Sequence, residues 1–118
     1  MSLAADVIHT AVEMNRSGIN SGSSGNVSAR HSDGFLITPT GMAYGDLEAA
    51  DLVLMSLSGA VVGGTRRPSS EWQFHRDIYA SRPEFGAIVH VHSRAATALA
   101  CLRQPIPAFH YMVAVAGG

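Results

Sequence analysis

The chain contains no lysine, and all eight of its basic residues are arginine. Without a lysine amine, catalysis through a Schiff base on this chain is excluded. Cysteine occurs once, at Cys101, so no internal disulfide can form and a reducing compartment is expected. Charged residues make up only 14% of the 118 positions and the net charge is -1, so the composition gives no basic surface for nucleic acid.

Long apolar runs are absent as well. No stretch reaches the roughly 18 residues needed to span a bilayer, so we expect no membrane segment. The N-terminal stretch carries Asp6 and Glu13 and lacks the pattern of a secretion signal, which together with the single cysteine predicts a cytoplasmic protein. Apolar residues nevertheless make up 47% of the chain, which indicates burial in an oligomer or a part of a larger fold.

Three segments have the spacing and the end signals of helices. Apolar residues three and four positions apart predict a helix over 3–16. A second helix is expected over 70–81 with Ser70 as its N-cap, because a glutamine follows three residues later in the capping-box position. A third is expected over 93–102, capped by Ser93. Three aromatic residues of the second helix are predicted to be core: Trp72, Phe74 and Tyr79.

Four short apolar segments between turn signals predict strands. Two of them, at 26–30 and 34–40, flank the turn HSDG, and the others lie near 52–57 and over 87–92. Because helices and strands alternate loosely along the chain, the fold class is α/β or α+β.

The most apolar strand, AIVHVH, contains two histidines. Residues two apart in a strand point to the same face, so His90 and His92 present two imidazoles side by side. This geometry suits two ligands of one Zn2+, and the alternative is two ordinary histidines with hydrogen-bond partners or water. Two protein ligands are too few for a catalytic zinc, which usually takes three, and no spacing selects any of the other four histidines.

Glu71 is the acidic residue expected at the start of the second helix. The helix dipole stabilises a carboxylate there, which is a sufficient structural reason for it. The functional alternative is a general base, or an acid beside a metal, in a site that faces the histidine strand. His75 lies four residues further on the same helix face, and a structural hydrogen bond is the expected role for it.

Small hydroxyl-bearing and glycine-rich stretches occur three times, as SSGN at 23–26, TPTG at 38–41 and PSS at 68–70. Each offers backbone N–H groups with little bulk, and the last opens a helix, where anions are attracted. Together they could hold a phosphate, although each one alone is an ordinary turn. Arg30, Arg66 and Arg67 could assist, although a solvated surface is the commoner place for such arginines.

The chain resembles the class II aldolase/adducin family over nearly its whole length. The likeness lies in an ordered set of motifs: SGNVSAR, LITPTGM, PSSEWQFHRDIY, AIVHVHS and IPAFHYMVAVAGG. The resemblance implies an α/β/α sandwich around a mostly antiparallel sheet, of which residues 1–118 would form a single, incomplete domain lacking its C-terminal part. It also implies a homotetramer with active sites between subunits.

The resemblance further implies one Zn2+ per full-length subunit, held by three histidines. Two of them match His90 and His92, while the third, and a proton-donating tyrosine, are expected beyond residue 118. Glu71 matches the carboxylate that moves the proton. The positions that match the family's phosphate pocket are Gly25, Asn26, Thr40, Gly41, Ser69 and Ser70.

The function implied is a zinc-dependent retro-aldol cleavage of a ketose 1-phosphate, such as fuculose 1-phosphate, to dihydroxyacetone phosphate and an aldehyde. The partner would be a phosphorylated sugar, with neither nucleic acid nor membrane involved. Two alternatives stay open: a related zinc-dependent sugar-phosphate epimerase, dehydratase or decarboxylase, and a non-catalytic, adducin-like binding module. The presence of Glu71, His90 and His92 together favours an enzyme over a module.

Overall fold

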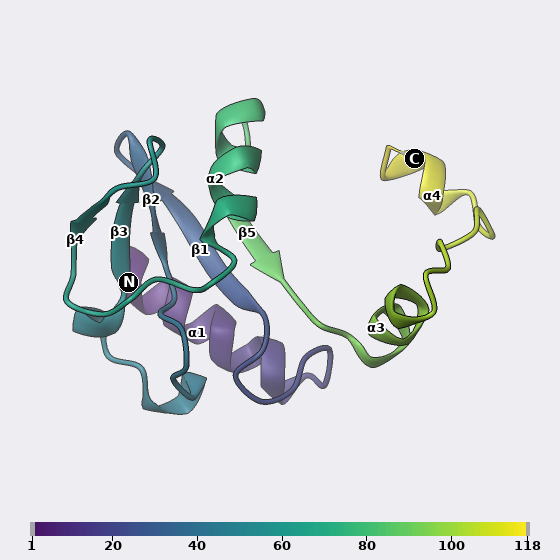
Figure 1. The fold of residues 1–118 in the computed structure, drawn as a ribbon, viewed down its shortest axis with the longest axis horizontal. Helices are drawn as coiled ribbons and strands as arrows, with labels where there is room; N and C mark the ends of the chain where they lie inside the picture. The colour runs from purple at the N-terminus through teal and green to yellow at the C-terminus, as the bar shows by residue number, and fades with distance from the viewer. Residues whose placement is uncertain (1, 118) are drawn as a thin grey trace.

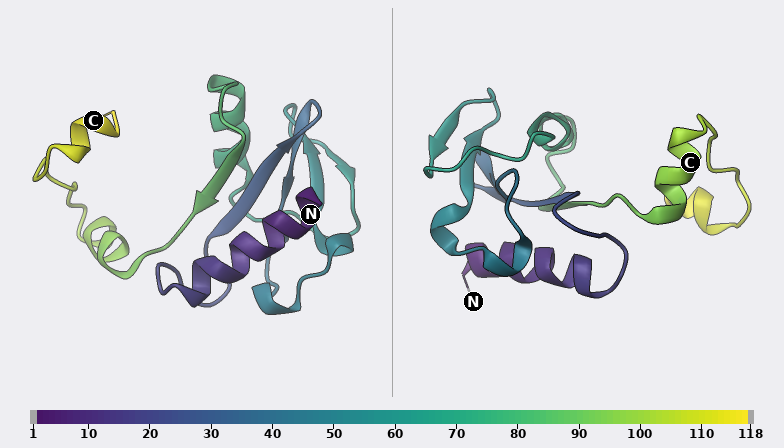
Figure 2. Two further views of the ribbon diagram at one scale, coloured as in Figure 1. Left: turned by 180° about the vertical axis from the view of Figure 1, so that it is seen from behind. Right: turned by 60° about the horizontal axis from the view of Figure 1, so that its bottom comes forward.

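A five-stranded antiparallel sheet with helices on both faces forms the body of the computed structural model, which describes residues 2–117 (Figures 1 and 2). The strands follow the order β4-β3-β2-β1-β5 across the sheet. This agrees with the expected α/β sandwich. The strands are β1 (Asn26–His31), β2 (Gly34–Ile37), β3 (Val53–Ser56), β4 (Val61–Gly63) and β5 (Ala87–His90).

Helix α1 (Leu3–Arg16) covers one face of the sheet and α2 (Trp72–Ser81) covers the other (Figure 2). The hydroxyl of Ser2 accepts the Ala5 N–H at 3.1 Å and caps α1, and Gly18 follows its end with a left-handed φ of 83°, as its sequence indicated. The remaining helical segments are η1 (Tyr44–Asp46), η2 (Ala49–Asp51), α3 (Arg94–Cys101) and α4 (Met112–Val115).

The alternation of side chains along β1 divides the core into two layers. Val27 and Ala29 point toward α1, and Ser28, between them, points toward α2. The buried cluster on the α1 side is Val7, Ala11, Met14, Val27, Ala29, Tyr44, Leu47 and Leu52. The cluster on the α2 side is Phe35, Ile37, Val53, Met55 and Tyr79.

The pairing of β1 with β5 brings distant parts of the chain together. Asn26 lies opposite His90, and Ile88 packs with the α2-side cluster, so His90, two residues further, points toward α2 as well. A second link joins residues 38–40 to 67–69, where the Ser69 N–H donates to the Thr38 carbonyl at 3.0 Å. The start of β1, the end of β5 and the start of α2 therefore meet.

Two predictions about the second helix are wrong. It begins at Trp72 with Glu71 in the N-cap position, so Ser70 is not the cap, and the Glu71 N–H instead donates to the Ser69 hydroxyl at 3.3 Å. Phe74 is 62% exposed rather than core, because the face of α2 that packs on the sheet is that of the buried residues His75 and Tyr79.

The ends of two predicted strands and the role of one arginine also differ. β2 stops at Ile37, because Pro39 contributes only an isolated bridge to Pro68, and β5 stops at His90. Ser93 is the N-cap residue of α3, but its side chain makes no capping hydrogen bond. Arg30 does not assist a phosphate: its guanidinium donates to the carbonyl groups of Tyr79, Arg82 and Phe85.

The chain beyond β5 leads away from the sheet, and α3 and α4 lie apart from it (Figure 1). Many of the large apolar side chains of this segment are exposed, and β5 is an edge strand. Within residues 2–117, no helix is both long and apolar enough to cross a membrane. The exposed apolar side chains include Leu102, Ile106, Phe109, Tyr111, Met112 and Val115.

Gly34 gives a test of the sheet register. A Cβ at this position would lie 1.9 Å from the Met55 carbonyl oxygen across the β2–β3 pair, whereas a Cβ at Gly45 meets nothing within 4 Å. We expect Gly34→Ala to lower the free energy of unfolding by about 3 kcal/mol or more, because backbone on the neighbouring strand must move. Gly45→Ala should change it by less than about 0.5 kcal/mol. Urea denaturation checks both, and equal stabilities would contradict the register.

Candidate metal centre

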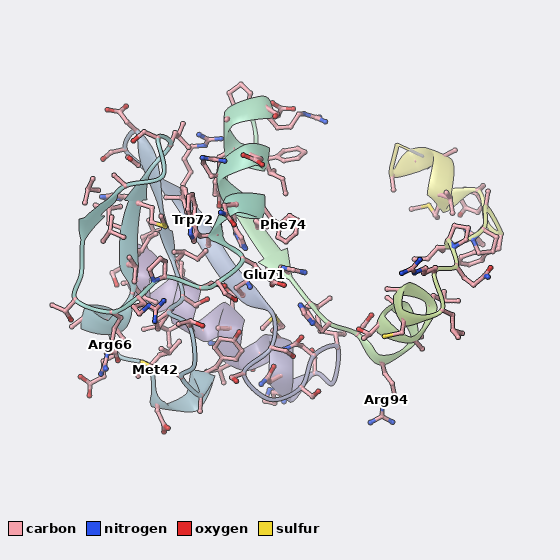
Figure 3. The ribbon with its side chains drawn as sticks, viewed as in Figure 1. Met42, Arg66, Glu71, Trp72, Phe74 and Arg94 are labelled. Carbon is pink, nitrogen blue, oxygen red and sulfur yellow. The ribbon has the colours of Figure 1, made fainter. Side chains whose placement is uncertain are left out.

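Three potential metal ligands converge where α2 begins and β5 ends. His90 Nδ1 lies 2.9 Å from Glu71 Oε2, and His92 Nε2 lies 3.5 Å from Glu71 Oε1. The two imidazole rings are 4.9 Å apart between centroids, so both histidines lie on the same side of the chain. Figure 3 shows Glu71 at the end of α2 that faces β5.

Asn20 keeps His92 in place after β5 has ended. Its side-chain oxygen accepts the His92 N–H at 2.8 Å, and its amide group donates to the Ser24 carbonyl at 2.7 Å. Asn20 is only 5% exposed, so water does not compete for these bonds. Reading the sequence missed this residue, because no local pattern links an asparagine to a histidine 72 positions away.

The carboxylate of Glu71 is oriented by Asn26. The Asn26 amide donates to Glu71 Oε2 at 2.9 Å, and Asn26 is only 2% exposed. Burial raises the pKa of Glu71, but the hydrogen bond from Asn26 and the charges of His90 and His92 outweigh it, so the pKa of this carboxyl lies below its ordinary value. Glu71 is therefore an ionised acceptor at neutral pH.

The arrangement fits a divalent cation. One ligand atom from each of Glu71, His90 and His92 lies within 4.8 Å of the others. Zinc bonds of about 2.0 Å at tetrahedral angles separate neighbouring ligand atoms by roughly 3.3 Å, close to the two distances found here. His90 Nδ1 is buried and has no hydrogen-bond partner among residues 2–117, despite its approach to the carboxylate. A cation between the two groups would satisfy both.

A small polar pocket of about 120 Å³ adjoins these ligands. Besides Glu71 and His92, it is lined by hydroxyl-bearing and small residues. Gly41, the remaining candidate from the sequence, lines an adjacent hollow with Tyr44 instead. The candidate phosphate-binding residues on the pocket wall are Gly25, Asn26, Thr40, Ser69 and Ser70. Of these, Asn26 already uses one amide N–H on Glu71 and its side-chain oxygen on His75, which leaves its second N–H for a ligand.

Glycine is required at position 25. Gly25 has a φ of 73°, and a Cβ there would lie 2.5 Å from the His90 carbonyl oxygen. The Tyr44 hydroxyl donates to the carbonyls of Ser24 and Gly25, and burial raises the pKa of this phenol to about 12. The 23–26 loop is thus held tightly against the end of β5, with its backbone beside the pocket.

His75 has the structural hydrogen-bond role that its position on the helix indicated. It is fully buried, with Nδ1 2.6 Å from the Ser28 hydroxyl and Nε2 bonded to Asn26 Oδ1. Burial, followed by the charge of His90, lowers the pKa of His75 to about 4, with a smaller opposing effect from Glu71. The ring is therefore neutral at physiological pH.

Comparison with known proteins now identifies the class of protein. Residues 5–118 match the Class II Aldolase and Adducin N-terminal domain. The chain belongs to the class II aldolase/adducin family, as its motifs indicated.

Two aldolases are among the relatives that the chain resembles over nearly its whole length. The chain is 50% identical over 118 residues to the 5-methylthioribulose-1-phosphate/5-deoxyribulose-1-phosphate aldolase of Rhodospirillum rubrum, covering all of this chain and 53% of that protein. It is 48% identical over 116 residues to the L-fuculose phosphate aldolase of Escherichia coli K12, covering 98% of this chain and 54% of the relative. The chain thus spans about half the length of the curated relatives it matches.

Solved structures agree with the sequence comparison. An L-fuculose 1-phosphate aldolase superposes with a TM-score of 0.88 at 38% identity, over 96% of this chain and 54% of the other. YgbL of Klebsiella pneumoniae, a candidate aldolase/epimerase/decarboxylase, superposes with a TM-score of 0.79 at 37% identity, over 89% of this chain and 51% of the other. The fold is therefore that of the class II aldolases.

His75 should make the protein less stable at mildly acidic pH. The pKa of His75 is about 4 in the folded state and close to 6.5 when unfolded, so between these values only the unfolded chain binds the proton. The free energy of unfolding should therefore fall as the pH decreases, by about 2 kcal/mol from His75 alone between pH 7 and 5. Urea denaturation of the metal-free protein at the two pH values measures this.

His75→Gln is the matched control, because glutamine is polar but does not titrate. The pH dependence of wild type minus that of His75→Gln isolates the histidine from the other ionisable groups. Identical pH dependence in the two proteins would contradict the lowered pKa.

Proposed function

We propose that the full-length protein is a zinc-dependent class II aldolase that cleaves a ketose 1-phosphate to dihydroxyacetone phosphate and an aldehyde. One observation carries the proposal: Glu71, His90 and His92 converge beside a pocket lined by Thr40 and serine hydroxyls. A carboxylate, two imidazoles and a small polar pocket are the groups that such a reaction needs within a few ångströms of one another.

In the proposed mechanism His90 and His92 hold the zinc. When bound, Zn2+ supplies Lewis-acid stabilisation of the substrate's carbonyl and hydroxyl oxygens. As the carbon–carbon bond breaks, the hydroxyl of the departing aldehyde loses its proton, which Glu71, ionised at rest, takes up and delivers to the carbon next to the ketone carbonyl. Asn26 keeps the carboxylate aimed while it does so. The reverse steps give aldol addition.

The phosphate end of the substrate would occupy the small pocket. The groups proposed to bind it are the hydroxyls of Thr40, Ser69 and Ser70, the backbone of Gly25 and the second amide N–H of Asn26, with Gly41 supporting the loop that carries Thr40. Ser69 and Ser70 immediately precede α2, whose N-terminal dipole favours an anion. Fixing the phosphate orients the reacting carbons relative to Glu71.

The remaining half of the protein completes the proposal. The third zinc-binding histidine and the proton-donating tyrosine are proposed to lie beyond residue 118, with residues 1–118 as the N-terminal part of one domain. Assembly into a homotetramer, in the cytoplasm, belongs to the same proposal. The exposed apolar residues beyond β5, such as Phe109 and Val115, support it, because apolar surface of this kind is normally covered.

Substrate tests distinguish the proposed function from its relatives. The full-length protein, loaded with zinc, is incubated with 5-methylthioribulose 1-phosphate, 5-deoxyribulose 1-phosphate and fuculose 1-phosphate, and dihydroxyacetone phosphate is measured. We expect dihydroxyacetone phosphate to be released from at least one of these three sugar phosphates. Epimerisation of ribulose 5-phosphate, or turnover of tetronate phosphates, without any release would favour the epimerase, dehydratase or decarboxylase alternative. No zinc and no turnover would favour a binding module.

Glu71→Gln should separate proton transfer from metal binding. We expect kcat to fall by roughly 10²- to 10⁴-fold, because a neutral amide cannot carry the proton. Zinc should still bind through the histidines, whereas His90→Ala should lose it. Glu84→Gln, an exposed acid after α2, is the control and should keep full activity. Metal analysis and steady-state kinetics check all three. Unimpaired turnover by Glu71→Gln would remove Glu71 from the mechanism.

Thr40→Val and Ser70→Ala test the phosphate pocket. Each removes one hydroxyl and keeps nearly the same shape. A hydrogen bond to a charged group contributes about 1.5–3 kcal/mol, so KM should rise roughly ten- to a hundredfold in each variant. Inorganic phosphate should also inhibit both variants less than it inhibits the wild type. Ser58→Ala, in the β3–β4 turn, is the control. Unchanged KM and phosphate inhibition would place the phosphate elsewhere.

A further inference from the structure

A chain of side-chain hydrogen bonds runs from Glu71 into the interior of the protein. Asn26 donates to Glu71, His75 bonds to Asn26, and Ser28 Oγ lies 2.6 Å from His75 Nδ1 and 2.8 Å from the Tyr79 hydroxyl. Beyond Glu71, each member is at most 2% exposed. Within residues 2–117, these hydrogen bonds cross between β1 and α2 and reach the surface at the carboxylate.

The chemistry of the groups permits one arrangement of protons. A carboxylate only accepts, so the NH2 group of Asn26 must face Glu71, and its oxygen must face His75. Because the Asn26 oxygen accepts, His75 must donate from Nε2, and its Nδ1 must accept from the Ser28 hydroxyl. The Ser28 oxygen accepts in turn from the Tyr79 hydroxyl. Every donor along the chain thus points toward Glu71.

We infer that His75 is a positioning residue that acts on Glu71 through Asn26, and that Tyr79 and Ser28 hold its ring in the Nε2–H form. An asparagine amide can rotate by half a turn with little change in shape. Only the partner at its oxygen decides which end meets the carboxylate. With the amide reversed, two oxygens would face each other and Glu71 would turn away from the histidines. The kinetic consequence of this inference rests on the proposed aldolase function.

The far end of the chain is itself fixed. The Arg30 guanidinium lies 4.7 Å above the Tyr79 ring and donates to the Tyr79 backbone carbonyl at 3.0 Å. Tyr79 also stacks on Phe35, with 5.3 Å between ring centroids. The phenol therefore has little freedom to reorient, and the orientation imposed on Ser28 is transmitted through His75 to the site.

Two substitutions of His75 in the full-length, zinc-loaded protein distinguish positioning from a merely structural role. His75→Leu removes the donor to Asn26. His75→Gln can restore it, because the glutamine amide nitrogen can occupy the place of Nε2. We expect kcat of His75→Leu to fall roughly ten- to a hundredfold with KM changed less than about twofold, and His75→Gln to recover most of the loss. A fall in stability with kcat unchanged in both would overturn the inference.

A second measurement does not depend on activity. Long-range 1H–15N spectra of the zinc-loaded wild type report which ring nitrogen of His75 carries the proton. Protonation at Nε2 alone is expected, and protonation at Nδ1 overturns the inference even if the enzyme is active. If His75→Leu does not fold, the inference is judged from this spectrum and from the kcat of His75→Gln. A wild type that binds zinc but cleaves no sugar phosphate contradicts the proposed function, while the spectrum still judges the role of His75.

Discussion

The antiparallel pairing of β1 with β5 determines where the candidate site residues lie. It sets Asn26 opposite His90 and thereby joins the amide that orients Glu71 to the strand that supplies the two imidazoles. Gly25 enforces the same contact from the loop side, since any larger residue would push against the His90 carbonyl. The geometry of the candidate metal site is therefore a property of the sheet register, because a slip of one residue would turn both histidines toward α1.

Strand β1 has polar residues at core positions, and these residues orient the Glu71 carboxylate. Ser28 and Asn26 occupy positions on β1 that face α2, where aliphatic side chains would otherwise pack against Tyr79 and Phe35. A buried polar group is tolerated only when its hydrogen bonds are made, and the links from Tyr79 to Glu71 satisfy these groups in series. What the network provides is a single direction for the carboxylate.

Sequence reasoning found the parts of this site that follow local rules. The two-residue period of a strand placed His90 and His92 on one side, and the helix expected over 70–81 placed Glu71 at its start, whereas in the structure Glu71 lies one position before the helix. It could not find Asn20 or Ser28, since their partners lie 72 and 47 residues away. Asn26 is a related case, because only the packed structure shows that its amide also joins Glu71 to His75.

Errors at the ends of elements have a similar origin. A capping-box spacing at Ser70 and Gln73 predicts a helix start, yet residues 67–69 are tied to 38–40, and this link delays the start to Trp72. The delay has a chemical consequence. It releases Glu71 from the helical turn into the N-cap position, where its carboxylate can turn toward β5. The lining of the pocket beside it, within residues 2–117, contains no arginine. Under the proposed function, the positive end of α2 and a cation held by the histidines would therefore balance the charge of the anionic ligand. Glu71, ionised at the same helix start, would favour the cation, so both proposed ligands depend on where α2 begins.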